Sequence, residues 1–188
     1  NPEAIPWGYP LIQYIRRSEF NRLDKSLRQR ALVAALVIDD QDHDWLELLA
    51  DNGISEIRAN DISAIVSDLN QLISRNQASA AYNFTRSARG FSGRVNFSDR
   101  AVLYLAVPNG PGWSAYLNGE PAEIIDSIGM MAILCEPGEH YFEFRYRTPG
   151  LIAGAMISGA GWLILLILLL LHRGISKSAG QLPRKARS

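Results

Sequence analysis

The chain has 188 residues, and its 19 Lys and Arg balance its 19 Asp and Glu, so the formal net charge is zero. A neutral chain gives no sign of nucleic-acid binding, which depends on a basic surface. The only cysteine is Cys135, which excludes an intramolecular disulfide and leaves no thiolate set for a metal ion.

Residues 1–10, with three prolines and one glycine, are typical of an extended linker. Within it, Trp7 either lies at a membrane interface or packs against the domain that follows. Apolar residues at helical spacing then predict three helices and one short strand, with Asp24 capping the first helix. The predicted helices cover residues 24–37, 44–52 and 61–73, and the predicted strand covers residues 54–58. We therefore expect residues 1–78 to form a linker and a helical segment.

A carboxylate cluster lies inside this segment and consists of Asp39, Asp40, Asp42 and Asp44 with His43 among them. Asp40, Asp42, Asp44 and Asp51 imitate the spacing of a calcium-binding loop. However, Trp45 occupies the position where such a loop needs glycine, and leucines follow at helical spacing. We interpret the cluster as a solvated turn whose carboxylates cap a helix.

From about residue 80 apolar and polar residues alternate, which is the pattern of strands with one buried face. The sharpest alternation predicts a strand whose core-facing side chains are Phe142, Phe144 and Tyr146. Its outward-facing side chains are then Tyr141, Glu143, Arg145 and Arg147. Asn-Gly and Pro-Gly turns separate six or seven short strands. We expect residues 79–150 to form a small antiparallel β-sandwich of jelly-roll-like type, giving an α+β chain.

Residues 151–171 hold no charged residue and no proline. As a helix they span roughly 31 Å, about the thickness of a bilayer's hydrocarbon core, so we expect one transmembrane helix there. The tail, residues 172–188, holds five Lys and Arg and no Asp or Glu, which places it in the cytoplasm and residues 1–150 outside. The first 30 residues contain no signal peptide. We therefore expect the C-terminal piece of a longer membrane protein, exported by an earlier transmembrane helix.

Few side chains are candidates for a site. Trp113 follows a Pro-Gly turn and is interpreted as a buried anchor, with an exposed platform for a sugar ring as the alternative. Tyr116 and His140 are further candidates for contact with a sugar or acceptor, although a structural hydrogen bond is the simpler role for His140. The apolar span carries small residues that let a second helix pack closely, namely Gly154, Ser158, Gly159 and Gly161. The sequence presents no nucleophile–base pair, phosphate loop or metal set.

Four short blocks of the sequence follow one another along the chain: Ile5-Pro6-Trp7-Gly8-Tyr9, Gly112-Trp113-Ser114-Ala115-Tyr116-Leu117-Asn118-Gly119, Pro137-Gly138-Glu139-His140 and Phe144-Arg145-Tyr146. With the apolar span and basic tail that follow, these blocks resemble the late part of the bacterial YfhO family. Asn118 stands where the family commonly has Asp, and residues 41–80 carry little of the resemblance.

The resemblance implies a multi-spanning protein of the bacterial cell membrane, similar to lipid-linked-sugar glycosyltransferases that decorate cell-envelope polymers. It also implies that the catalytic carboxylate lies upstream, in an early extracytoplasmic loop, so no catalytic, cofactor-binding or metal-binding residue is expected in this chain. The expected partners are membrane lipids, upstream transmembrane helices, a polyprenyl-phosphate-sugar donor and an envelope-polymer acceptor. The alternative function is a non-enzymatic, membrane-tethered carbohydrate-binding or scaffolding module.

Overall fold

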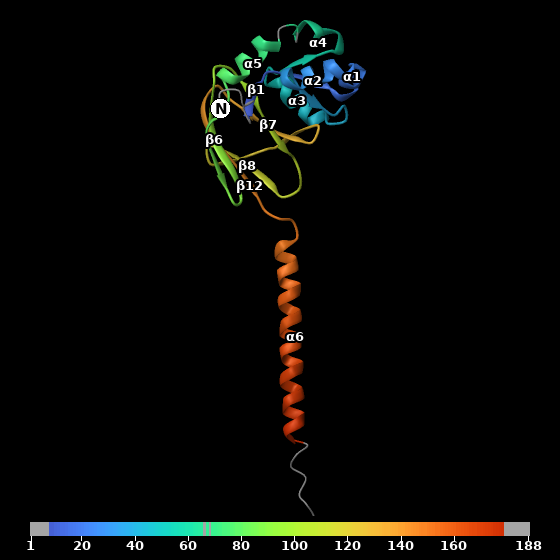
Figure 1. Ribbon diagram of the computed structural model, residues 1–188, viewed down its shortest axis with the longest axis vertical. Helices are drawn as coiled ribbons and strands as arrows, with labels where there is room; N and C mark the ends of the chain where they lie inside the picture. The colour runs from blue at the N-terminus through green and yellow to red at the C-terminus, as the bar shows by residue number, and fades with distance from the viewer. Residues whose placement is uncertain (1–7, 66, 68, 179–188) are drawn as a thin grey trace, which may run out of the picture. The chain divides into compact units, whose positions relative to one another are not determined.

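The computed structural model describes residues 8–65, 67 and 69–178. The chain divides into two compact units, Asn1–Arg147 and Thr148–Ser188 (Figure 1). The first unit combines helices with antiparallel sheets and the second holds one long apolar helix, which confirms the α+β prediction at that level. Trp7 and the three basic residues near the end of the tail lie outside the described residues.

Two antiparallel sheets contain most of the strands. The first has four strands in the order β1-β7-β11-β10, and the second has five in the order β5-β6-β12-β8-β9. The four strands are β1 (Gly8–Leu11), β7 (Ala101–Pro108), β11 (Met130–Cys135) and β10 (Ile125–Ser127). The five strands are β5 (Tyr82–Ser87), β6 (Gly90–Phe97), β12 (Gly138–Tyr146), β8 (Trp113–Leu117) and β9 (Glu120–Ala122).

The two antiparallel sheets share one hydrophobic cluster, to which β6, β8 and β12 contribute from one sheet and β7 and β11 from the other. Phe142 and Phe144 are fully buried in it, as the alternation predicts, whereas Tyr141 is 41% exposed. Tyr146 is 38% exposed, so the prediction that its side chain lies in the core is wrong. The physical reason is its place as the last residue of β12, where the strand runs past the core.

The four-stranded sheet is buried on both faces. The neighbours Val102 and Leu103 point to opposite faces, and both are fully inaccessible to solvent. Leu103 belongs to the cluster shared with the five-stranded sheet, while Val102 belongs to a second cluster shared with the N-terminal part of the chain. Burial on both faces explains why β7 is an apolar run rather than an alternating one.

The N-terminal part contains a small parallel sheet that the sequence analysis missed. Its strands are β2 (Gln13–Arg16), β3 (Leu36–Ile38) and β4 (Ser55–Ile57), in the order β3-β2-β4. Only β4 was predicted, so the expectation of a helical segment is wrong for the other two. All three residues of β3 are buried. Because this short apolar run continues the apolar pattern of the preceding helix, the predicted helix extended into it, to Val37.

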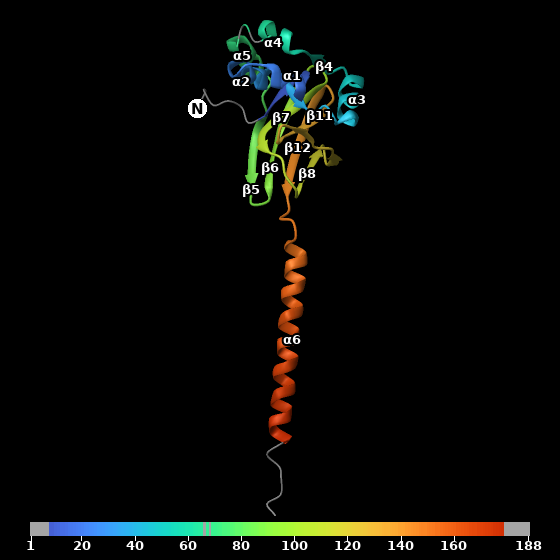
Figure 2. The same cartoon turned by 90° about the vertical axis from the view of Figure 1, so that its right-hand side faces the viewer.

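Helices cover this parallel sheet, and Figures 1 and 2 show them gathered at the side of the unit away from the five-stranded sheet. They are α1 (Arg17–Arg22), α2 (Lys25–Ala34), α3 (His43–Asp51), α4 (Ala59–Ile65) and α5 (Leu69–Ala78). A third hydrophobic cluster joins the sheet to α1, α2, α4 and α5, whereas α3 packs into the second cluster.

The helix boundaries differ in detail from the predicted ones. Asp24 caps α2 as predicted, because its side chain accepts hydrogen bonds from the backbone N–H groups of Ser26 (2.8 Å) and Leu27 (2.9 Å). The helix predicted over residues 61–73 is two helices, and α2 ends before β3 instead of at Val37. The linker predicted for residues 1–10 is wrong from Gly8 onward, where β1 pairs with β7.

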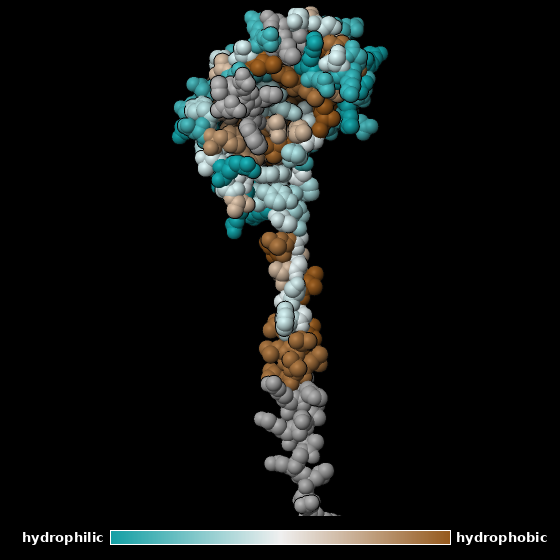
Figure 3. All heavy atoms as spheres, viewed as in Figure 1, coloured by the Kyte–Doolittle hydropathy of each residue, from teal (hydrophilic) through white to brown (hydrophobic). Residues whose placement is uncertain are grey.

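The second unit is α6 (Leu151–Ser178), which continues past the predicted end at residue 171. Its segment Leu151–Leu170 is long and apolar enough to cross a membrane, and it contains no Asp, Glu, Lys or Arg. The large apolar side chains of this segment are between 49% and 74% exposed. Figure 3 shows a paler first half, where glycine and serine gather, followed by a uniformly hydrophobic half.

Candidate functional site

A cavity of about 500 Å³ opens at the end of the antiparallel sheets where β8 begins and β12 ends. Trp113 and Tyr146 pair there across the two strands, with their ring centroids 5.1 Å apart. Trp113 is half-buried and meets Phe91 edge-to-face at 5.7 Å. The cavity is lined by Phe84, Arg86, Ser87, Ala88, Arg89, Gly90, Phe91, Val107, Trp113 and Tyr146. We call this region the open end.

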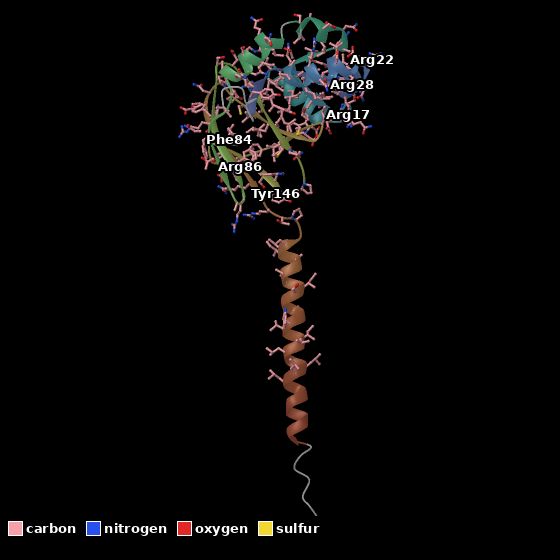
Figure 4. The ribbon with its side chains drawn as sticks, in the orientation of Figure 1. Arg17, Arg22, Arg28, Phe84, Arg86 and Tyr146 are labelled. Atoms are coloured by element: carbon pink, nitrogen blue, oxygen red, sulfur yellow. The ribbon has the colours of Figure 1, made fainter. Side chains whose placement is uncertain are left out.

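The hairpin that joins β5 to β6 forms one wall of the open end (Figure 4 labels Phe84, Arg86 and Tyr146). Gly90 has φ +149°, and a Cβ at this position would lie 1.9 Å from the backbone oxygen of Phe144. Only glycine therefore lets the hairpin lie this close to β12. This approach brings Phe91 into a stack on Phe144, with 5.1 Å between the ring centroids.

The opposite end of the β8–β12 pair carries a polar network, which we call the closed end. The two-residue turn between β8 and β9 is Asn118-Gly119, as the sequence predicted, and both residues have positive φ. Asn118 Oδ1 accepts a hydrogen bond from the backbone N–H of Tyr141 at 2.9 Å, and its Nδ2 lies 2.8 Å from His140 Nδ1. His140 Nε2 lies 2.8 Å from the Glu136 carbonyl oxygen.

These contacts determine the tautomer of His140. A carbonyl oxygen only accepts, so Nε2 must carry the proton that it donates to Glu136. Nδ1 is then the acceptor for the amide of Asn118. His140 thus joins the turn after β8 to the turn before β12, which is the structural role favoured by the sequence.

Tyr116 lies at neither end. Its ring contacts the guanidinium group of Arg145, whose Cζ is 4.6 Å from the ring centroid. Arg145 in turn pairs with Glu143 at 2.7 Å on the outward side of β12. The three candidate contacts for a sugar or acceptor, Trp113, Tyr116 and His140, therefore occupy three separate places and do not converge on one site.

Asp39 and Asp40 of the carboxylate cluster lie at the carboxyl ends of the parallel strands β2 and β3. Asp42 is the N-cap residue of α3, but its side chain makes no capping hydrogen bond, so the predicted cap is wrong there. Arg17 pairs with Asp39 at 3.0 Å, and Ser18 Oγ donates to Asp40 Oδ1 at 2.6 Å. The Ser18 hydrogen bond lowers the pKa of the Asp40 carboxyl. Within residues 8–65, 67 and 69–178, no group of three or more His, Cys, Asp or Glu is arranged to hold a metal ion.

A polar cleft of about 470 Å³ borders this cluster. It is lined by Arg17, Val37, Asp39, Gln41, Asp42, Asp126, Ile128 and Gly129. Sequence reasoning missed the cleft because it missed the parallel sheet, whose strand ends form one side of it, while β10 and the turn after it form the other. It also missed the open end, since Phe84, Arg86 and Arg89 come from a hairpin whose turn has no strong sequence signature.

The small residues of α6 lie on its exposed surface. Ser158 and Gly161 line a shallow groove with Trp162 and Leu165. Apart from the adjacent backbone of α6 itself, a Cβ added at Gly154, Gly159 or Gly161 would meet no atom of the described residues within 4 Å. Their packing against a second helix stays a prediction.

Comparison with known proteins gives one match. The family model described as bacterial membrane protein YfhO matches residues 62–158, which is more than half of the chain. The matched stretch runs from α4 into the first turns of α6 and includes every strand of the two antiparallel sheets except β1. Searches of curated proteins and of solved structures find no match. The order of sheets and apolar helix agrees with the blocks that carry the sequence resemblance, and the chain belongs to the YfhO family of bacterial membrane proteins.

Proposed function

We propose that this chain is the C-terminal part of a multi-spanning bacterial membrane protein that transfers sugars from a lipid-linked donor to a cell-envelope polymer. In this proposal residues 8–147 are an extracytoplasmic module with a β-sandwich, and α6 is the last transmembrane helix. Membership of the YfhO family supports a membrane location. The module would cover the membrane-embedded catalytic core from outside and help to orient the acceptor.

The observation that carries the membrane part of the proposal is the exposed apolar surface of α6. From Leu151 to Leu170 its large apolar side chains are about half exposed or more, and no acidic or basic residue interrupts them. Burial of one such side chain is worth roughly 1.5–3 kcal/mol, so the whole segment strongly favours lipid over water. Its small-residue positions, Gly154, Ser158, Gly159 and Gly161, would pack against upstream helices of the same protein.

The sidedness can be tested by cysteine labelling in intact cells. We expect Glu120→Cys to react with a membrane-impermeant thiol reagent and Ser178→Cys to react only after lysis, because the basic tail favours the cytoplasm. We expect the native Cys135 thiol not to react with the reagent, because it is fully buried and burial raises its pKa to about 12. Labelling of Ser178→Cys without lysis, together with a silent Glu120→Cys, would reverse the orientation.

The enzymatic part is tested in cells that lack the full-length protein. We expect the intact protein to restore sugar incorporation into an envelope polymer, and a version without the module to insert into the membrane yet transfer less sugar. A protein whose upstream acidic loop residues are neutralised should lose transfer while the module stays folded. Unchanged transfer in that variant would favour the second candidate, a membrane-tethered binding or scaffolding module. The aromatic cavity at the open end supports a binding role in either case.

A further inference from the structure

The walls and rim of the open end differ in chemistry. Four aromatic rings and one valine supply the walls, from Phe84, Phe91, Trp113, Tyr146 and Val107. The hairpin adds the exposed arginines Arg86 and Arg89 beside them. A cavity of about 500 Å³ is large enough for part of a lipid-sized ligand. The combination suits a molecule with an apolar part and a negatively charged group.

A sugar ring would find neither a carboxylate nor a side-chain amide in this lining. Protein sites fix the orientation of a ligand through a few precisely placed polar groups, and hydroxyl-rich ligands need several such partners. The residues that line the cavity include no Asp, Glu, Asn or Gln. Trp113 is also in contact with rings on two sides, from Phe91 and Tyr146. Arginine, by contrast, matches a phosphate group with paired hydrogen bonds.

The covalent chain limits how far the open end can lie from the start of α6. Tyr146 precedes Leu151 by five residues, and five fully extended residues span at most about 18 Å. If α6 spans a bilayer, Tyr146 therefore cannot move far from the headgroup layer. Tyr and Trp are enriched at such interfaces, and basic side chains there are attracted to anionic lipids.

We propose that the open end binds an anionic phospholipid of the bilayer in which α6 is anchored. Arg86 and Arg89 contact the phosphate-bearing headgroup, while the aromatic rings and Val107 cover the upper part of the lipid. The inference rests on the proposed function in one respect, that α6 crosses the bilayer.

The test uses the full chain in nanodiscs that contain either phosphatidylcholine alone or phosphatidylcholine with phosphatidylglycerol. A fluorophore on Ala88→Cys, in the hairpin at the open end, reports contact with a lipid that carries a spin label on its headgroup. Ser98→Cys is the matched control, because Ser98 follows the other end of β6 and is exposed. We expect stronger quenching of Ala88→Cys in the anionic discs and little quenching of Ser98→Cys in either disc.

Charge-removing variants sharpen the test. Arg89→Gln and the double variant Arg86→Gln/Arg89→Gln should lower the ratio of docked to undocked module about fivefold for each arginine removed. Arg89→Lys keeps the charge and should keep most of the quenching, which also shows that substitution at this position leaves the hairpin folded. Equal quenching in the two kinds of disc, or equal quenching of Ala88→Cys and Ser98→Cys, would overturn the inference.

A third labelled position separates this inference from the proposed function. A fluorophore on Ile157→Cys should be quenched by a spin label on the acyl chains if α6 spans the bilayer. A quenched Ile157→Cys with an unquenched Ala88→Cys refutes only the lipid site. An unquenched Ile157→Cys refutes the membrane span itself, and the lipid site with it.

Discussion

At the closed end of the β8–β12 pair, the side chains of Asn118 and His140 lie 2.8 Å apart, and each also contacts the backbone, Asn118 at Tyr141 and His140 at Glu136, at 2.8–2.9 Å. At the open end, Trp113 and Tyr146 contact each other, with ring centroids 5.1 Å apart, and line a cavity. Hydrogen bonds to the backbone fix one geometry, whereas aromatic contacts tolerate a range of geometries. The same two strands thus carry hydrogen-bonded side chains at one end and an aromatic cavity at the other.

The largest effect should come from the core between the two ends. Phe144 is fully buried and stacks on Phe91, so Phe144→Ala should lower the free energy of unfolding by about 3–5 kcal/mol and disturb both ends together. Denaturant unfolding of the full chain in detergent micelles measures this loss. The exposed neighbour Tyr141→Ala is the control and should change little. A small loss for Phe144→Ala would mean that the sheets do not depend on their shared core.

Two glycines allow a matched substitution at the two ends. Gly90→Ala at the open end should cost about 3 kcal/mol, because its Cβ would collide with the backbone of Phe144 as well as strain a positive φ. Gly119→Ala at the closed end should cost only about 1 kcal/mol, since its Cβ would meet nothing within 4 Å and only the φ of +91° is strained. Unfolding free energies of the two variants should therefore differ. Equal costs would contradict the close approach of the hairpin to β12.

Trp113→Ala tests whether the open end contributes to folding. Because Trp113 is half-buried, we expect a loss of about 2 kcal/mol, roughly half of the value for a fully buried aromatic side chain. Trp113→Phe, which keeps an aromatic ring, should recover part of the lost stability, as measured by thermal melting. An unchanged melting temperature would mean that Trp113 does not stabilise the fold and serves ligand contact alone. A loss of stability as large as that of Phe144→Ala would mean that Trp113 stabilises the fold as much as a fully buried aromatic side chain.

His140→Ala removes the link between the two turns of the closed end. Two partly exposed hydrogen bonds are lost, so we expect a destabilisation of about 1–2 kcal/mol. The headgroup quenching of the Ala88 label should not change, because that label lies at the other end of the pair. A changed quenching signal would show that the two ends are coupled, which would contradict the view that they act separately.

The smallest effect is an acid dependence near the closed end. Hydrogen bonds from Arg94 (2.9 Å) and Tyr82 (2.8 Å) lower the pKa of Glu139 below its ordinary value of 4.5. Since the folded-state pKa is the lower one, this stabilisation is complete above about pH 4.5 and is lost as the pH falls through the lowered pKa. Glu139 is exposed, so the change should be slight. Glu139→Gln should remove this part of the acid dependence; identical pH profiles for both proteins would contradict it.

Several features could be predicted because neighbouring residues determine them. The Asp24 cap depends on N–H groups two and three residues away, and the Asn118-Gly119 turn depends on its own backbone angles. The alternation that buries Phe142 and Phe144 is a property of one strand. The apolar span depends on composition alone.

Other features depend on partners far away in the sequence. β1 was taken for a linker because its pairing partner, β7, lies about 90 residues downstream. β3 was taken for the end of a helix because its three buried residues acquire strand geometry only beside β2. The cavity at the open end needs the β5–β6 hairpin, the end of β7, the start of β8 and the end of β12, which are four separate parts of the chain.

The sequence by itself determined the apolar helix, the alternating strands, the tight turn and the family, because each rests on local periodicity or on a short motif. Only the tertiary structure decided that the four-stranded sheet is buried on both faces, that a parallel sheet lies beside it, and that Trp113, Tyr146 and Arg89 meet around one cavity. The physical reason is that burial and pairing are properties of distant segments brought together, which no local pattern encodes.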